Sequence, residues 1–226
     1  MKNTITLFVM LLAVISASNA SFSQTQIGED IDGVVDEYAG SSVSLSSDGT
    51  RVAIGAPSDA VTMGGHARVY EWDGGSWTQM GQDIGAEALK WGSIVSLSSD
   101  GTRVIIGAPG DKFSGHTGRV GVFEWDGGSW TQMGEDFVGE TGLDGFGGIV
   151  SLSSDGTRIA IRSSPANNGY MGQVQVYEWD GGSWTQMGAD IEGEVVKGGS
   201  VVWLSIDGTR VIIGAAGDNR SGQTAW

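Results

Sequence analysis

The sequence predicts an all-β fold, a β-propeller of four-stranded antiparallel blades with about 53 residues per repeat. Three observations lead to this fold class. Two strings recur along the 226 residues at one interleaved period, and apolar and polar residues alternate within each repeat. No segment after Ala20 keeps apolar residues at the 3.6-residue period of a helix, and 39 glycines interrupt the chain.

The two recurring strings define the repeat. Because they interleave at a common step of 52 to 55 residues, each repeat is one structural module. The string DGTR occupies Asp48–Arg51, Asp100–Arg103, Asp155–Arg158 and Asp207–Arg210. The string EWDGGSWTQMG begins at Glu71, Glu124 and Glu178.

The first half of each module predicts a β-hairpin. In residues 43–54, a two-residue type I′ turn at Asp48-Gly49 places Leu45 opposite Val52, with the large apolar residues on one face. Small side chains then fall on the other face, where they let a neighbouring sheet approach closely. These small residues are Ser44, Ser46 and Ala53.

The second half predicts another hairpin, closed by the loop 73–76. Its register places Trp72 opposite Trp77 and Tyr70 opposite Gln79. Two interpretations of the facing tryptophans are open: a clamp that holds the outer hairpin together, or a platform on which sugars stack. Corresponding pairs are Trp125 with Trp130 and Trp179 with Trp184.

Residues 1–20 are typical of a cleavable export signal. Lys2 provides the positive start, residues 5–15 are apolar, and small residues precede a cleavage site after Ala20. The apolar stretch is shorter than the roughly 20 residues that cross a bilayer. We therefore expect a secreted or cell-surface protein with no membrane insertion after cleavage.

After the signal we expect a single propeller repeat region, residues 21–226. Its repeats are expected at about 34–86, 87–139, 140–193 and, in part, 194–226. Residues 25–31 copy residues 78–84, the end of a blade, which gives about 3.5 blades in all. Three interpretations stay open: a fragment of a longer propeller, an irregular four-bladed ring that 25–31 helps to close, or a homodimer that pairs open blade edges.

Charge and composition exclude several classes. The formal net charge of −15 disfavours nucleic acid and anionic membranes as partners. The absence of cysteine excludes a disulfide scaffold and a cysteine nucleophile. His66 and His116 stand at different places in their repeats, so a repeated histidine metal site is not expected.

Further pairs and triplets resemble a known repeat. Trp91-Gly92 and Phe146-Gly147 precede first hairpins, and Gly55-Ala56-Pro57 and Gly107-Ala108-Pro109 follow their second strands. This pattern resembles the FG-GAP repeat, the blade motif of integrin-α-type propellers. The third and fourth repeats depart from it, with 162–165 and 214–217 in place of the triplet.

The resemblance implies a test for calcium, because calcium-binding members carry several acidic residues in the loop between the first two strands. Here each loop keeps one aspartate followed by glycine, whereas calcium takes six to eight oxygen ligands. We expect no metal or cofactor, with calcium as the alternative, and attribute the aspartates to turn geometry. The candidates for that alternative are Asp48, Asp100, Asp155 and Asp207.

Two other sets of acidic residues recur. One follows the Gly-Ala-Pro element, where propeller loops converge, and supplies candidate ligand-binding residues: Asp59, Asp111 and Asp218, with Asn167 in the corresponding place of the third repeat. The other follows the outer strand, and we interpret it as a solvated edge that opposes aggregation: Asp83, Asp136 and Asp190.

These features favour a non-enzymatic extracellular binding or adhesion module with a protein or glycan ligand. The alternatives are a carbohydrate-active enzyme on a propeller scaffold, with loop carboxylates as acid and base, or a fragment without activity of its own. Near-identical repeats favour binding, because catalysis requires one asymmetric site.

Overall fold

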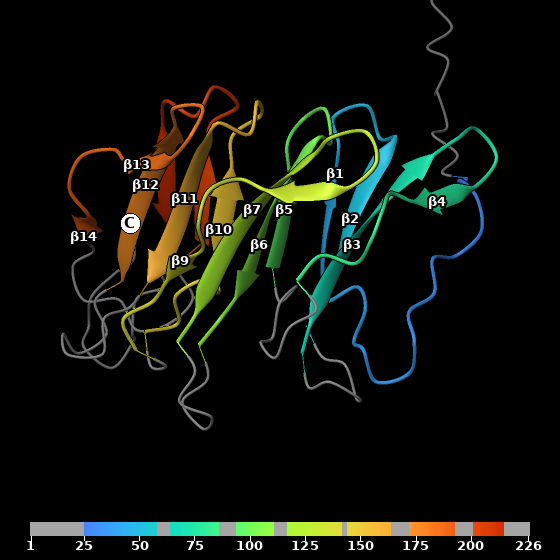
Figure 1. The fold of residues 1–226 in the computed structure, drawn as a ribbon, viewed down its shortest axis with the longest axis horizontal. Coiled ribbons are helices and arrows are strands. Elements are labelled where there is room, and N and C mark those ends of the chain that lie inside the picture. Colours follow the sequence, from blue (N-terminus) through green and yellow to red (C-terminus); the bar gives the residue numbers. More distant parts are fainter. Residues whose placement is uncertain are drawn as a thin grey trace, which may run out of the picture.

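The computed structural model describes residues 25–57, 64–85, 94–110, 117–141, 144–163, 172–192 and 201–214. These residues form sixteen strands, and none of them lies in a helix (Figure 1). Accordingly, this part of the chain has no helix long and apolar enough to cross a membrane. The expected export signal, residues 1–20, lies outside the described residues. The predicted all-β fold is confirmed.

The strands form three antiparallel blades and a two-stranded sheet. Blade 1 contains β1 (Ser42–Leu45), β2 (Arg51–Ala56), β3 (His66–Trp72) and β4 (Trp77–Gln79) in that order. Blade 2 contains β5 (Ile94–Leu97), β6 (Arg103–Ala108), β7 (Arg119–Trp125) and β8 (Trp130–Gln132), with β9 (Phe137–Val138) also pairing with β7.

Blade 3 repeats this plan. It contains β10 (Val150–Leu152), β11 (Arg158–Ser163), β12 (Gln173–Trp179) and β13 (Trp184–Gln186), and β14 (Ile191–Glu192) also pairs with β12. The described part of blade 4 is the hairpin of β15 (Val201–Leu204) and β16 (Val211–Gly214). Each sheet lies within one of the four expected repeats.

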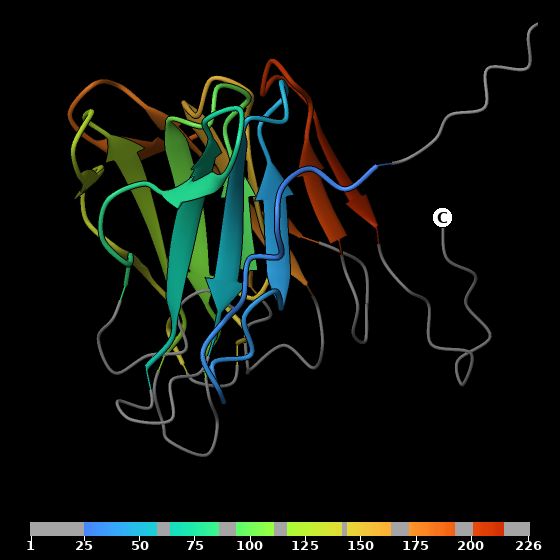
Figure 2. The same ribbon diagram turned by 90° about the vertical axis from the view of Figure 1, so that its right-hand side faces the viewer.

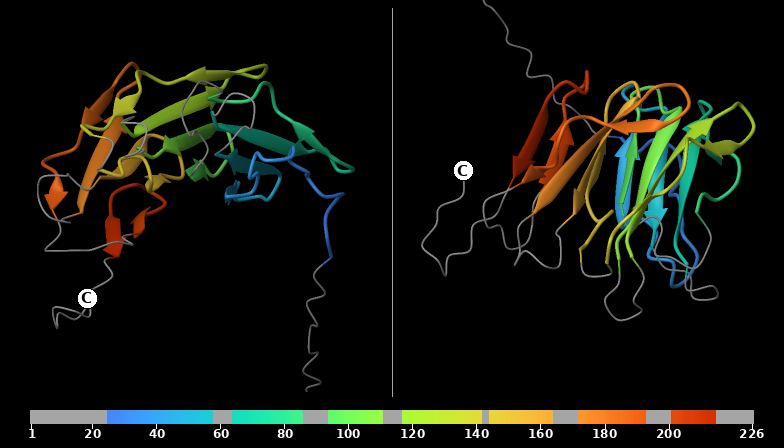
Figure 3. Two further views of the ribbon diagram at one scale, coloured as in Figure 1. Left: turned by 90° about the horizontal axis from the view of Figure 1, so that it is seen from below. Right: turned by 60° about the vertical axis from the view of Figure 1, so that its left-hand side comes forward.

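The blades fan out along an arc, as the view from below shows (Figure 3). The first strands of successive blades contact one another: β1 with β5, β5 with β10 and β10 with β15. The turns between first and second strands lie along one rim of the arc. Second strands end at the opposite rim, where the Gly-Ala-Pro elements lie (Figures 1 and 2). The fold is therefore a propeller arc of about three and a half blades.

The register of the first hairpin is as predicted, with Leu45 opposite Val52 and the second hairpin pairing Trp72 with Trp77. The type I′ turn is wrong, because that turn requires positive φ at both central residues and only Gly49 has one, 74°. The Asp48 carboxylate accepts hydrogen bonds from the Ser46 hydroxyl and the Thr50 N–H, and these hold a wider turn.

Small serines let adjacent blades approach, as expected. The Ser42 and Ser44 hydroxyls of blade 1 accept hydrogen bonds from backbone N–H groups of blade 2 at 3.0 and 2.9 Å, and Ser151 does the same for blade 4. Apolar side chains fill the space beside them, for example Val104 and Ile106 against Ala53 and Val69. Blade 4 has Trp203 in the place of Ser44 and Ser151.

The tryptophan pairs act as joints between blades. Gly81, at the end of the TQMG string of blade 1, lies against Trp125 of blade 2, and Trp130 donates its indole N–H to the Met80 carbonyl at 2.8 Å. Gly81 has a φ of 70°, a backbone conformation that glycine adopts without strain. The same hydrogen bond joins Trp184 to Met133 at 2.8 Å. Each pair thus holds its own hairpin together and also binds the tail of the preceding blade. The tail is the segment after the fourth strand, such as residues 80–84 of blade 1.

The N-terminal segment 25–30 uses the same joint. Its Gly28 lies against Trp72, and the Trp77 indole N–H donates to the Ile27 carbonyl at 3.1 Å. The segment therefore occupies the place of a preceding blade's tail on blade 1. Among the described strands, β16 of blade 4 pairs with β15 alone.

The DGTR arginines connect neighbouring turns. Arg51 donates to the Glu71 carboxylate of its own blade at 2.7 and 3.0 Å and to the Asp100 carbonyl of the next at 3.2 Å. Arg103 and Arg158 make the corresponding contacts. Residues of both repeated strings therefore form the contacts within and between blades that hold the propeller together; we call this set of contacts the frame.

Candidate functional site

The aspartates considered for calcium lie in the turns between first and second strands. The Asp48 Oδ1 atom accepts from the Ser46 hydroxyl, the Thr50 N–H and the Thr50 hydroxyl at 2.7 to 3.0 Å. The Thr50 N–H contributes most to lowering the pKa of Asp48 from 3.8 to about 2. Asp100, Asp155 and Asp207 make equivalent bonds. Within the described ranges no three histidine, aspartate or glutamate side chains form a metal-binding group.

These turns predict acid sensitivity. The pKa of Asp207 is also lowered to about 2, chiefly by the Ser205 hydroxyl. Because the folded-state pKa values lie below 3.8, the unfolded chain binds more protons below about pH 4. Stability present above about pH 4 should therefore be lost as the pH falls towards about 2, although the falling negative charge alone would favour the compact state. Urea titrations followed by tryptophan fluorescence test this, and a constant midpoint from pH 5 to about 2 would contradict it.

The candidate ligand-binding residues Asp59, Asp111 and Asp218, and likewise Asn167, lie outside the described residues. His116 lies outside them too. At the rim that carries the Gly-Ala-Pro elements, the structure describes the ends of the strands and the segments that lead into each blade. Examples are 31–41 and 137–148, apart from residues 142 and 143.

The interpretation of Asp83, Asp136 and Asp190 as a solvated edge is wrong. Each of these carboxylates is bound to the third strand of its own blade. Asp83 pairs with Arg68 at 2.9 Å, Asp136 with Arg119 at 3.2 Å, and Asp190 accepts from Gln173 and Gln175. They therefore fasten the kinked tail of each blade to the sheet.

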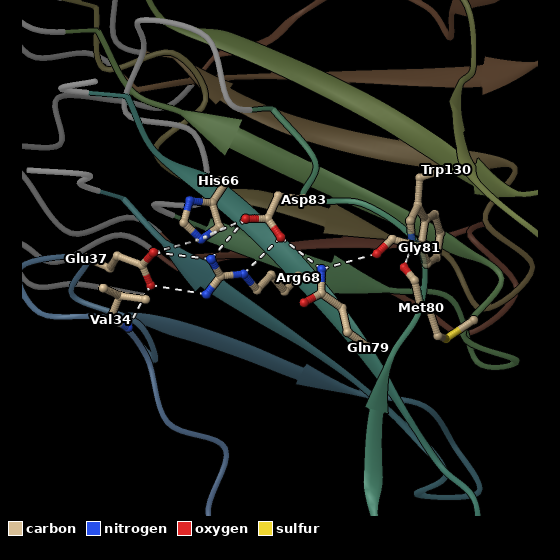
Figure 4. A network of polar contacts seen from close by, with 9 residues as sticks. All are labelled: Val34, Glu37, His66, Arg68, Gln79, Met80, Gly81, Asp83 and Trp130. Carbon is tan, nitrogen blue, oxygen red and sulfur yellow. Dashed lines mark hydrogen bonds and ion pairs between the residues drawn. The ribbon is translucent and has the colours of Figure 1, made fainter. Parts of the chain in front are cut away.

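In blade 1 this contact grows into a buried ionic network (Figure 4). The Arg68 guanidinium lies between two carboxylates, Glu37 at 3.1 and 3.2 Å and Asp83 at 2.9 Å. The Glu37 side chain is 9% exposed and also accepts from the Val34 N–H at 2.9 Å. The His66 Nε2 atom lies 3.8 Å from Glu37 and 3.7 Å from Asp83.

The opposite charges in this network stabilise the ionised forms of its carboxylates and of its arginine. Burial opposes ionisation of Glu37, but the Val34 N–H and Arg68 outweigh it and lower the pKa of Glu37. The hydrogen bond with Asp83 is the largest cause that raises the pKa of Arg68. The network fills its surroundings, since the cavity beside His66, Arg68 and Tyr70 measures about 10 Å³.

The corresponding place between blades 2 and 3 is an open cavity of about 210 Å³. Residues of four kinds line it: aromatic rings, amides, carboxylates and small residues. The aromatic and amide residues are Phe137, Phe146, Tyr177, Gln173 and Gln175, and the carboxylates are Glu140, Asp144 and Asp190. The Phe137 and Tyr177 ring centroids lie 4.6 Å apart. Burial is the largest cause that raises the pKa of Tyr177.

Sequence reasoning missed both the network and this cavity. The signal that marks them is a difference between repeats: Arg68 of β3 corresponds to Gly121 of β7 and to Gln175 of β12, whereas the flanking residues hardly change. A position that varies inside a near-identical repeat therefore indicates a place where the blades differ in structure.

The chain resembles known proteins in its fold. No protein-family model matches the chain, and no curated protein matches it. The chain is similar to the β-propeller domain of the Trilobed protease from Pyrococcus furiosus, which has an open velcro topology (TM-score 0.46, 14% identity, 80% of this chain and 51% of that one). It is also similar to Kuenenia stuttgartiensis hydrazine synthase (TM-score 0.49, 17% identity, 76% and 49%). Saccharomyces cerevisiae Sqt1 is a third (TM-score 0.47, 13% identity, 70% and 36%). The chain spans about half or less of the length of these three structures.

Proposed function

We propose that the chain is an exported, non-enzymatic propeller module of the FG-GAP type that binds a protein or glycan at the rim where the Gly-Ala-Pro elements lie. One observation carries the proposal: the repeated polar residues of the described blades are engaged in the frame. The turn aspartates, the DGTR arginines and the tail aspartates all bond within or between blades. The sequences that follow the Gly-Ala-Pro elements differ from repeat to repeat, and binding residues are commonly carried by variable loops that a rigid scaffold positions.

Contacts between blades 2 and 3 support the FG-GAP assignment. A Cβ atom added to Gly107 would meet the Gly147 carbonyl oxygen, and one added to Gly118 would meet the Phe146 carbonyl oxygen. The Phe-Gly pair of one blade therefore packs directly on the Gly-Ala element of the preceding blade. This close approach gives a physical reason for glycine in both elements.

A combined binding and turnover assay tests the proposal. The exported protein, expected to begin at Ser21 by intact-mass measurement, is applied to a glycan array and to immobilised extracellular proteins, and in parallel to a panel of glycosidase substrates. We expect saturable binding without turnover. Turnover abolished by a single Asp→Asn substitution would instead support the enzyme.

We also propose that two chains pair through the open ends of the arc. Val43 and Leu45 on blade 1 are 63% and 59% exposed, and Trp203 and Ile212 on blade 4 are 65% and 68% exposed. Apolar sheet faces of this kind are costly to leave in water. Light scattering coupled to size exclusion should give a discrete dimer, and a monomer at all concentrations would contradict the pairing.

A further inference from the structure

Blade 1 provides an internal reference for the cavity between blades 2 and 3. Arg68 and Gln175 both stand two residues before the Tyr-Glu-Trp string, and Asp83 and Asp190 follow the two TQMG strings at the same distance. Glu37 and Asp144 stand three residues before Gly40 and Gly147, each in the segment that leads into its blade. Both carboxylate positions are thus kept in blade 3, but the cation between them is replaced by an amide.

The carboxylates of blade 3 are held by neutral donors. Asp190 accepts from the side-chain amides of Gln173, Gln175 and Gln186, and Asp144 accepts from the Thr141 and Phe146 N–H groups at 2.9 Å. Asp144 is 3% exposed. The described residues that line the cavity include no cation, and Glu140 adds a third carboxylate. The Arg162 guanidinium lies beside Gly145, outside this lining.

Volume and shape agree with this difference. Where Arg68 is present, about 10 Å³ is left, and where Gln175 stands in its place, the cavity measures about 210 Å³. Sites for drug-sized ligands run from about 300 to 1,000 Å³, so this cavity suits one small group. Phe137 and Tyr177 add aromatic rings to the lining, and planar guanidinium groups stack favourably on such rings.

We propose that the cavity between blades 2 and 3 binds a guanidinium group from outside the described blades, in the place that Arg68 fills in blade 1. This inference rests on the proposed binding role and specifies its chemistry. The group comes from a free small molecule or from an arginine side chain of a partner. Carboxylates and aromatic rings in one lining favour it over a neutral amide of the same shape.

Isothermal titration of the full chain with butylguanidinium, and with butylurea as its neutral counterpart, tests the site. We expect butylguanidinium to bind at least about tenfold more tightly than butylurea, because its N–H donors are charged and those of butylurea are neutral. An acetyl-Ala-Arg-Ala-amide peptide forms the second arm. Tighter binding of the peptide indicates a partner's side chain, and binding of the small probe alone indicates a free cation. Equal affinity for butylguanidinium and butylurea, or no binding of either guanidinium probe, overturns the proposal.

Two variants locate the binding. Gln175→Arg restores the residue of blade 1 and fills the cavity, so affinity for butylguanidinium should fall at least about tenfold while the melting temperature holds or rises. Thr185→Arg places the same charge on an exposed position of β13 outside the cavity and should leave affinity unchanged. Asp190→Asn keeps an acceptor oxygen, removes the charge and should weaken binding similarly, which covers poor folding of the first variant.

The outcomes separate this proposal from the binding role itself. If Gln175→Arg leaves guanidinium affinity unchanged, the cavity is not the site. If, in that case, an array ligand binds parent and variant equally tightly, the rim-binding role stands although the guanidinium proposal fails.

Discussion

Replacing Arg68 by alanine should destabilise the protein by about 3 kcal/mol, because truncating one partner of a buried ion pair leaves the other charge unpaired. Glu37 is 9% exposed and Asp83 34% exposed, and both lie within hydrogen-bond distance of the guanidinium. Neither carboxylate has a second arginine or lysine partner among the described residues. The free energy of unfolding in urea, measured at pH 7, gives the value directly.

Arg119→Ala is the matched control. Arg119 stands at the place of His66 in its blade and pairs with Asp136 at 3.2 Å, so it also joins a third strand to the residues after the fourth, but its side chain is 43% exposed. An exposed pair contributes about 0–1 kcal/mol, so this variant should lose little stability. Equal losses for both variants would mean that burial of the blade 1 network has no energetic consequence.

Gly81→Ala should destabilise the protein by a comparable amount, about 3 kcal/mol, through two separate effects. Its φ of 70° costs an alanine about 1–2 kcal/mol. Its new Cβ atom would lie 2.7 Å from the Trp125 ring, so the joint between blades 1 and 2 has to open. The midpoint of urea unfolding should fall, with the fluorescence of all nine tryptophans as the probe.

Gly188→Ala separates the two effects. Gly188 ends the same TQMG string with a φ of 75°, but a Cβ atom there meets nothing within 4 Å. The control therefore carries the backbone cost alone, about 1–2 kcal/mol. If both substitutions cost the same, the tryptophan pair does not clamp the preceding tail.

Much of the blade follows from local pattern. Alternation of apolar and polar residues in 43–54 fixes which residues face each other, because a shift by one residue would move every apolar side chain to the other face. The turn type was not predictable from these two residues alone. The Ser46 hydroxyl and the Thr50 N–H both donate to the Asp48 carboxylate, and these bonds hold a turn wider than two residues. The register survives because the strands, not the turn, decide it.

The site depends on contacts that no local pattern contains. Glu37 and Arg68 are 31 residues apart and meet only because the segment leading into blade 1 lies over the start of β3. Asp83 looks like a surface residue in the sequence, and only the kink at Gly81 brings it back to its own sheet. Of the contacts between blades, the sequence predicted only that small serines allow close approach. It did not predict the hydrogen bonds that these serines accept from the next blade.

The central claim is that each tryptophan pair locks the tail of the preceding blade. Hydrogen exchange of the tryptophan indole N–H groups, followed by NMR of ¹⁵N-labelled protein, tests it most directly. The indole N–H groups of Trp77, Trp130 and Trp184 are bound to the carbonyls of Ile27, Met80 and Met133, and should exchange slowly. At protein concentrations low enough to keep the chain monomeric, the indole of Trp203, which is 65% exposed, should exchange fast. Exchange of all four at the same fast rate would contradict the account.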